Sequence, residues 1–262
     1  MDVDTGEANA SLPEVAERRR VLMRELVMRL MLGRRAPVTL LLIGIMVFVF
    51  VLSVLLGGST EPAVLEVLGA KVNELVNRGE RWRLVSSVFV HVGPFHLLVN
   101  GYALYVLGRL AENGLGRRRF LILFVLAGLA GSVSSYLASP HPSAGASGAI
   151  FGLLGASLAS GVKYRASIPG RLRRQLAMAL IPWLVLTLLY GFSADNIDNA
   201  AHLGGLAAGM GYGLLVDAPL LAGGEAEPEA SIVVNLALGA AMGLLLYGAV
   251  GTLASVLHSG IA

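Results

Sequence analysis

The chain has 262 residues, of which 55% are hydrophobic and only 14% charged, with a formal net charge of +3. A soluble domain carries roughly 25% charged residues, so this composition, with a mean hydropathy of +0.72, excludes an ordinary soluble protein and indicates an integral membrane protein. The absence of cysteine excludes disulfides and thiolate metal sites, and the dispersal of the basic residues between apolar runs argues against nucleic acid as a partner.

Seven apolar runs follow one another along the chain. A helix that crosses a bilayer needs roughly 20 mostly apolar residues. The runs that approach this length are 38–56, 95–110, 120–137, 147–162, 176–190, 200–216 and 232–257. The fourth and fifth are short, and we expect them to begin or end below the membrane surface. The predicted fold class is therefore all-α, a polytopic membrane helix bundle.

The loop charges predict an orientation. The N-terminal segment, the loop after the second run and the loop after the fourth run hold seven, four and five basic residues, which is 16 of the 20 in the chain. Because Lys and Arg accumulate on the cytoplasmic side, we expect the N-terminus in the cytoplasm and the C-terminus outside a cell membrane. The first 35 residues hold seven arginines without a leading apolar core, so we expect no cleaved signal peptide.

The same pattern predicts the organisation of the chain. We expect a cytoplasmic N-terminal segment (1–36), a six-span core (37–216), a cytoplasmic linker (217–231) and an additional C-terminal membrane helix (232–262). Within the core, the outer loop (57–94) is too long for a plain connection. Its apolar pattern predicts an amphipathic helix that lies in the membrane interface.

Two polar residues lie where hydrocarbon is expected. Ser147 begins the fourth run within Gly145-Ala146-Ser147-Gly148, and His202 lies at the start of the sixth run. With the predicted topology, both fall near the outer surface on helices that run in the same direction. A buried histidine costs several kcal/mol unless it is paired or hydrated, and serine becomes a good nucleophile only when a base takes its proton. The two residues together predict a nucleophile and its general base.

Glycine spacing predicts that the two helices touch. On the sixth run, three glycines share the helical face of His202, namely Gly205, Gly209 and Gly213. On the fourth run, three glycines follow Ser147, namely Gly148, Gly152 and Gly155. Such faces let helices approach closely. Taken singly, each motif also fits a helix cap, a packing surface or a structural histidine.

A third element lies on the second run. His96 and Asn100 are four residues apart, so they share one helical face near the outer end. Directed at the Ser147 region, they could donate hydrogen bonds to an oxyanion beside the Ser147 N–H. The alternative is interhelical hydrogen bonding that only holds the bundle together.

Taken together, these residues resemble the rhomboid family of intramembrane serine proteases. The resemblance covers nearly the whole bundle and rests, in chain order, on Trp82-Arg83, His91, His96-x-x-x-Asn100, Gly145-Ala146-Ser147-Gly148-Ala149-Ile150-Phe151-Gly152 and Ala201-His202-Leu203-Gly204-Gly205. It implies a rhomboid-like six-span core, with the seventh run as an appended C-terminal helix.

The resemblance also implies roles for individual residues. Ser147 is then the nucleophile, His202 the general base, and His96 and Asn100 the oxyanion donors. Phe151 packs against the catalytic histidine, and Gly145, Gly148 and Gly205 support the site. Trp82-Arg83 and His91 are structural, and Asp198, the obvious candidate for a triad acid, is interpreted as a loop residue because the family works with a Ser–His dyad.

The implied activity is that of an intramembrane serine endopeptidase without cofactor or metal. Its partners would be the lipid bilayer and single-span transmembrane protein substrates, presented beside the fifth run and under the loop 191–199. Two other functional classes are alternatives. A non-catalytic rhomboid-like protein that binds membrane clients would lack Ser or His at these positions, and a small transporter would show internal repeats and midplane charges.

Overall fold

The computed structural model describes residues 36–193, 197–219, 221 and 232–260. These residues form helices joined by turns and loops, with one isolated β-bridge between Lys71 and Ser143. The predicted N-terminal segment and most of the predicted linker 217–231 lie outside the described residues, apart from Ala36 and a few linker residues. The all-helical class of the fold is confirmed.

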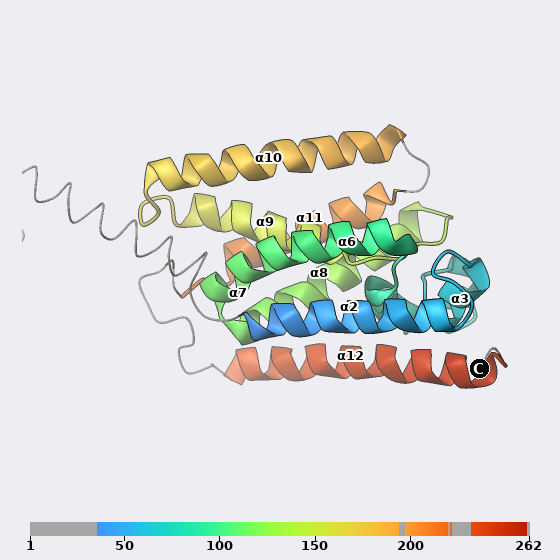
Figure 1. Cartoon of the computed structure of the whole chain (residues 1–262). Helices are drawn as coiled ribbons and strands as arrows, with labels where there is room; N and C mark the ends of the chain where they lie inside the picture. Colours follow the sequence, from blue (N-terminus) through green and yellow to red (C-terminus); the bar gives the residue numbers. More distant parts are fainter. Residues whose placement is uncertain (1–35, 194–196, 220, 222–231, 261–262) are drawn as a thin grey trace, which may run out of the picture.

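Helices occupy all seven predicted runs (Figure 1). They are α2 (Pro37–Leu55), α6 (Gly93–Ala103) continued by η3 (Leu104–Gly108) and α7 (Arg109–Leu115), α8 (Arg117–Ala138), α9 (Ser147–Lys163), α10 (Gly170–Ser193), α11 (Asn199–Leu215) and α12 (Ile232–His258). Within the described residues, α2, α8, α10 and α12 are long and apolar enough to cross a membrane, and the bent pair Arg83–Phe89 and Gly93–Leu115 adds a fifth candidate.

The two helices that carry the predicted dyad are shorter than a full span. α9 and α11 have 17 residues each, or about 26 Å at 1.5 Å per residue, against roughly 30 Å of hydrocarbon. Figure 1 shows both between α10 on one side and α2 and α12 on the other. At their starts, His202 of α11 is buried and Ser147 of α9 is partly buried.

Glycines hold α9 and α11 together at backbone contact. A Cβ added at Gly205 would lie 1.9 Å from the carbonyl oxygen of Gly148, and one added at Gly209 would lie 1.9 Å from that of Gly152. No side chain fits at such distances, so only glycine permits this packing. The predicted contact between the two glycine faces is confirmed.

The N-terminus of α2 is capped from another helix. Glu112 of α7 is buried, and its carboxylate accepts hydrogen bonds from the Val38 N–H (3.1 Å), the Thr39 N–H (2.8 Å) and the Thr39 hydroxyl (2.7 Å). These amides belong to the first turn of a helix, where no intrahelical acceptor exists. A buried carboxylate thus fastens the first helix to the bent span.

Replacing Glu112 by alanine should lower the free energy of unfolding by about 1–3 kcal/mol, because two buried donors and one partly buried donor lose their acceptor. Thermal unfolding in detergent, followed by circular dichroism, measures the change. Glu74→Ala is the control, since Glu74 forms an ion pair with Arg78 in which both side chains are exposed and which contributes about 0–1 kcal/mol. Equal losses in both variants would contradict the capping role.

The outer loop folds differently from the prediction. It contains α3 (Pro62–Val67), α4 (Asn73–Asn77), α5 (Arg83–Ser86) and η2 (Ser87–Phe89), so the single amphipathic interfacial helix is wrong. The chain turns at Gly69, whose φ of +99° favours glycine and ends the helical pattern. Val64, Leu65 and Leu68 then bury themselves in a small core of their own.

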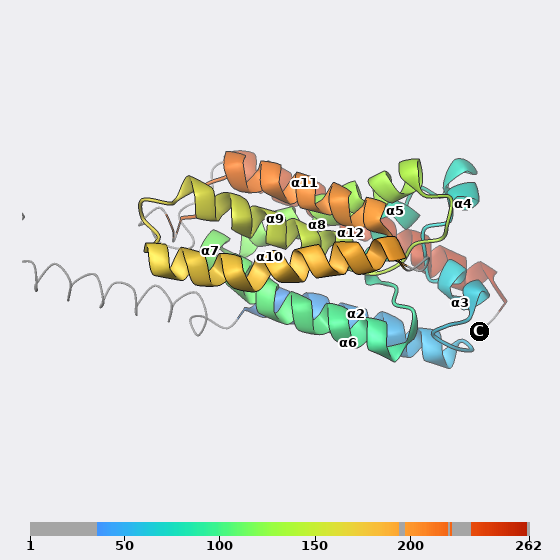
Figure 2. The same cartoon turned by 90° about the horizontal axis from the view of Figure 1, so that it is seen from above.

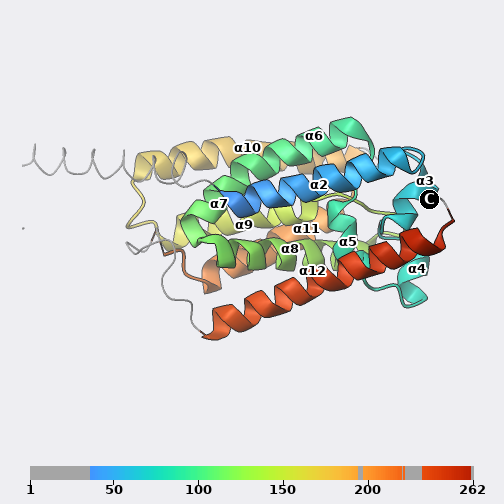
Figure 3. The same ribbon diagram turned by 60° about the horizontal axis from the view of Figure 1, so that its bottom comes forward.

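The last helix joins the bundle. α12 packs along α8 and against α5 of the outer loop, as the turned view in Figure 3 shows. Much of its surface remains exposed, whereas Ala241 and Gly248 are buried at these contacts. The sequence predicted a separate helix after a linker, and the structure places it against the elements that precede the predicted nucleophile.

Candidate active site

Ser147 is the first residue of α9, directly after a tight turn. The first N–H groups of a helix lack intrahelical acceptors and lie at the positive end of its dipole. The turn depends on Gly145, whose φ is +127°. A Cβ at Gly145 would lie 2.7 Å from Cε1 and 2.9 Å from Nε2 of His96. The His96 imidazole therefore lies against the turn that leads to Ser147.

A backbone contact orients the His96 ring. The Val92 N–H donates to His96 Nδ1 at 3.3 Å. In a neutral imidazole one nitrogen accepts and the other carries the proton, so this contact leaves the proton on Nε2, the nitrogen nearest the Gly145 turn. His96 thus presents a hydrogen-bond donor beside the start of α9.

Asn100 lies one helical turn after His96 and is buried. Its Nδ2 donates to the carbonyl oxygen of His96 at 2.9 Å. The amide has two hydrogens, and this bond uses one of them while it fixes the side chain. The structure therefore keeps both predicted donors on one face of α6.

His202 is buried on α11 and stacks on an aromatic ring of α9. The His202 and Phe151 rings are parallel within 1°, with centroids 4.2 Å apart. Phe151 follows Ser147 by four residues, so both lie on the same face of α9. A Cβ at Gly148 would lie 3.3 Å from the Ala201 carbonyl oxygen. The two helices thus approach each other beside Ser147 and beside His202.

Asp198 does not act on the imidazole through a hydrogen bond. Its carboxylate caps α11 by accepting from the Ala201 N–H at 3.0 Å and also accepts from the Ser135 hydroxyl. Burial alone would raise the pKa of Asp198, but the hydrogen bonds from Ser135, Ala201 and Ser143 and the charge of Lys71 lower the pKa overall. His202 Nδ1 is buried and has no hydrogen-bond partner among the described residues. Asp198 is therefore engaged as the cap of α11, and no described carboxylate is hydrogen-bonded to His202 Nδ1.

Three residues around the site are not marked by any pattern in the sequence. Lys71, from the outer loop, is completely buried, and its Nζ donates to the carbonyl oxygens of His141 (2.7 Å) and Ser139 (3.3 Å). Ser87 accepts the Gly145 N–H at 2.9 Å through its carbonyl oxygen. Trp183 of α10 lies 5.5 Å from Phe151, measured between ring centroids. A lone lysine, serine or tryptophan carries no periodic signal that would have identified it.

Two further histidines make contacts of their own, His91 beside His96 and His258 within α12. His91 Nδ1 is 3.1 Å from the Phe89 carbonyl oxygen, and its ring centroid is 5.2 Å from that of His96. His258 bonds within its own helix, to the Ala254 carbonyl oxygen at 2.7 Å. Within the described part of the chain, no three His, Asp or Glu side chains gather in a way that could hold a metal ion.

Comparison with known proteins gives one family. The Rhomboid domain matches residues 78–218. The chain is 39% identical over 210 residues to Rhomboid protease GluP of Bacillus subtilis, which is 80% of this chain and 40% of that protein. It is 39% identical over 155 residues to RHOMBOID-like protein 5 of Arabidopsis thaliana, which is 58% of this chain and 49% of that protein. It is 35% identical over 137 residues to Putative rhomboid protease YdcA of B. subtilis, which is 52% of this chain and 67% of that protein. The chain spans less than half the length of the first two relatives.

Proposed function

Since the chain belongs to the rhomboid family, we propose that it is an intramembrane serine endopeptidase that cleaves transmembrane segments of other membrane proteins. One observation carries the proposal. His202 stacks in parallel on Phe151, at a glycine-packed contact, and Phe151 lies one helical turn after Ser147 on the helix that Ser147 begins. The printed names of two relatives, Rhomboid protease GluP and Putative rhomboid protease YdcA, agree with it.

The proposed chemistry uses a dyad. Ser147 Oγ attacks the scissile carbonyl carbon while an imidazole nitrogen of His202 takes the hydroxyl proton. The tetrahedral intermediate collapses when the C–N bond breaks, and the same nitrogen returns the proton to the leaving amine. Water, deprotonated by His202, then hydrolyses the acyl-enzyme and releases Ser147. Asp198 has no part in these steps because it caps α11.

The negative oxygen of the intermediate needs donors that are already oriented. The N–H of Ser147 at the helix start, the second amide hydrogen of Asn100 and the Nε2–H of His96 would serve. Fixed donors stabilise such an oxygen strongly in a site from which bulk water is excluded. Val92 and the His96 carbonyl oxygen hold two of the three donors in place.

The substrate segment would approach beside α10. This helix packs lightly on the bundle, with exposed side chains such as Leu186 and Leu189, and Figure 2 shows it lying alongside α9 and α11 with α6 on its other side. Trp183, on the same helix, contacts Phe151. A displaced α10 would therefore open a lateral path to the dyad. Part of the loop 191–199, predicted to cover this path, lies outside the described residues.

The proposed orientation follows the charges. The Arg117–Arg119 cluster and the arginines at the α9–α10 connection lie at the ends of helices opposite to the end where α9 begins (Figure 1). Arg109 is the first residue of α7, in the second half of the bent span. Cationic ends face the cytoplasm. The dyad then opens toward the outer side of the cell membrane, where water for hydrolysis is available.

Labelling with a serine-directed fluorophosphonate tests the proposal. We expect the wild-type protein in detergent to be labelled at Ser147 and His202→Ala to lose the label, because an unassisted hydroxyl reacts slowly. His258→Ala is the matched control, since that imidazole bonds to the Ala254 carbonyl oxygen within α12. A wild-type protein that resists labelling and leaves reporter substrates intact would instead fit a rhomboid-like protein that binds clients without cutting them.

Replacing Asn100 by alanine should slow cleavage about 10²–10³-fold without abolishing it, because one donor to the oxyanion is lost and two remain. The loss should fall on kcat with KM nearly constant, since the donor acts on the transition state. Steady-state kinetics on a reporter substrate in proteoliposomes measures both constants. An unchanged rate would show that Asn100 only packs.

A further inference from the structure

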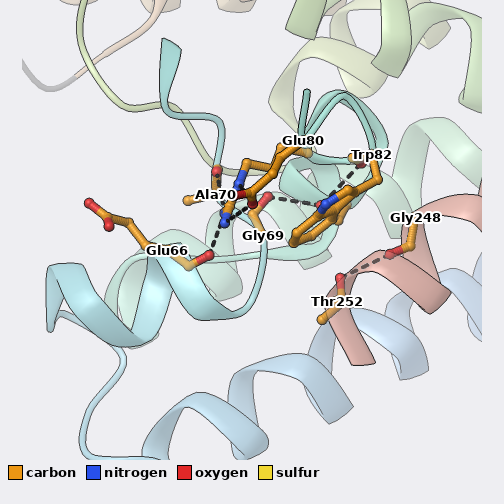
Figure 4. Close-up of polar contacts among 9 residues, drawn as sticks. Glu66, Gly69, Ala70, Glu80, Trp82, Gly248 and Thr252 are labelled. Carbon is orange, nitrogen blue, oxygen red and sulfur yellow. Dashed lines mark hydrogen bonds and ion pairs between the residues drawn. The ribbon is translucent and has the colours of Figure 1, made fainter. Parts of the chain in front are cut away.

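The C-terminal helix makes its closest contact with the outer loop through glycine. A Cβ added at Gly251 would lie 2.3 Å from Cγ and Cδ2 of Trp82, and one added at Gly248 would lie 3.2 Å from Cγ1 of Val85. Figure 4 shows the Trp82 indole directed at the stretch of α12 that holds Gly248 and Thr252. The indole therefore lies directly on the surface of α12.

Trp82 is also confined on its other sides. A Cβ at Gly69 would lie 2.6 Å from Cζ3 of the indole, and the Arg83 guanidinium lies 4.5 Å from the ring centroid, a cation–π distance. The same guanidinium donates to the carbonyl oxygens of Glu66 and Ala70 and pairs with Glu80 at 2.6 Å, as seen around Trp82 in Figure 4. A shift of Trp82 would thus move α5 with it.

α5 connects this contact to the predicted nucleophile within a few residues. It runs directly into η2, whose first residue, Ser87, accepts the Gly145 N–H at 2.9 Å. The Ser87 hydroxyl also lies 3.2 Å from that of Ser132 on α8. Gly145 begins the turn that ends at Ser147, so an unbroken series of contacts leads from α12 to the start of α9.

We propose that α12 sets the position of the Gly145–Ser147 turn through Trp82, with Gly251 as the positioning residue. The proposal rests on the proposed function for its catalytic consequence. The seventh helix is then part of the active-site framework, and a side chain at position 251 displaces α5, the Ser87 carbonyl oxygen and the turn that this oxygen holds. Close packing transmits such shifts because interiors have little free volume.

Three glycines of one helix give a graded test in the full chain. Gly251→Ala should lower kcat about 10- to 100-fold, the effect of displacing a catalytic group by about 1 Å, with KM unchanged. Gly248→Ala, whose nearest contact is 3.2 Å, should have a smaller effect. Gly243→Ala should have none, because a Cβ there meets no described atom of another element within 4 Å. If Gly251→Ala fails to fold, the kcat of Gly248→Ala is compared with that of Gly243→Ala. A lower kcat in Gly248→Ala alone supports the proposal, and equal values overturn it.

Hydrogen–deuterium exchange of the Gly145 amide gives a readout that needs no activity. Faster exchange in Gly251→Ala together with slower fluorophosphonate labelling supports the proposal. Unchanged exchange overturns it, as does faster exchange with a wild-type labelling rate. Should the wild-type protein show neither labelling nor cleavage, the proposed function fails, and the exchange rates still decide whether α12 holds the turn.

Discussion

Ser147→Ala is expected to reduce cleavage of a single-span reporter substrate by on the order of 10⁴-fold or more, because the covalent route is lost while binding remains. The fold should persist. Ser147 is the first residue within α9, whereas the N-cap position is held by Ala146, so the substitution removes no helix cap. We expect the free energy of unfolding to change by about 0.5 kcal/mol or less. Cleavage in proteoliposomes and thermal unfolding of the same preparation measure the two quantities.

A second serine of the same helix provides the control. The Ser157 hydroxyl donates to the Leu153 carbonyl oxygen at 2.7 Å within α9, ten residues after Ser147. Ser157→Ala should cleave at the wild-type rate. Cleavage that persists in Ser147→Ala would remove the nucleophile assignment, and equal loss in both variants would assign the effect to the stability of α9.

In the proposed dyad, His202 is a base without an acid behind it. In a Ser–His–Asp triad the carboxylate accepts from the imidazole, fixes its tautomer and stabilises the imidazolium. Here stacking on Phe151 orients the His202 ring, while the nearest candidate carboxylate, Asp198, is occupied by Ala201 and Ser135. In the proposed dyad, ring stacking therefore orients the imidazole in place of a carboxylate, and it adds no further buried charge.

The parts of this fold that sequence predicts are those set by local periodicity. The seven runs became helices with ends within a few residues of prediction, apart from α6–α7 and α10, which extend further. The α9–α11 contact followed from glycines spaced so that they share one face. Hydropathy and helical spacing are properties of short segments, so a single chain reveals them.

The parts that sequence could not supply depend on contacts between distant segments. Lys71 looks like a loop lysine, and only the folded chain shows its Nζ among the carbonyl oxygens of the loop before Ser147. Glu112 looks like one more charge at a cytoplasmic end, yet it caps α2. The apolar residues of α3 fit an interfacial helix until the turn at Gly69 folds them onto the protein. Each of these three placements depends on which distant segment of the chain packs against the residue, and local sequence patterns do not show this.

Gly209→Ala is expected to destabilise the protein by a net ~2 kcal/mol. Alanine gains about 1 kcal/mol over glycine in helix propensity, but its Cβ would lie 1.9 Å from the carbonyl oxygen and 2.6 Å from Cα of Gly152. These are backbone atoms, which cannot rotate away, and overpacking costs about 3 kcal/mol. The helices must separate, so His202 also moves from the start of α9 and activity falls. Thermal unfolding and reporter cleavage measure both effects.

The same helix carries the control two residues further on. A Cβ at Gly211 meets no described atom of another element within 4 Å, so Gly211→Ala keeps the propensity gain without the clash. It should stabilise α11 by up to about 1 kcal/mol and leave cleavage unchanged. Glycine-to-alanine substitution should therefore lower the free energy of unfolding at position 209 and raise it at position 211, because only Gly209 faces the backbone of α9. If Gly209→Ala stabilises the protein as Gly211→Ala does, then α9 and α11 do not meet at their glycines, and the framework that brings His202 to Ser147 is refuted.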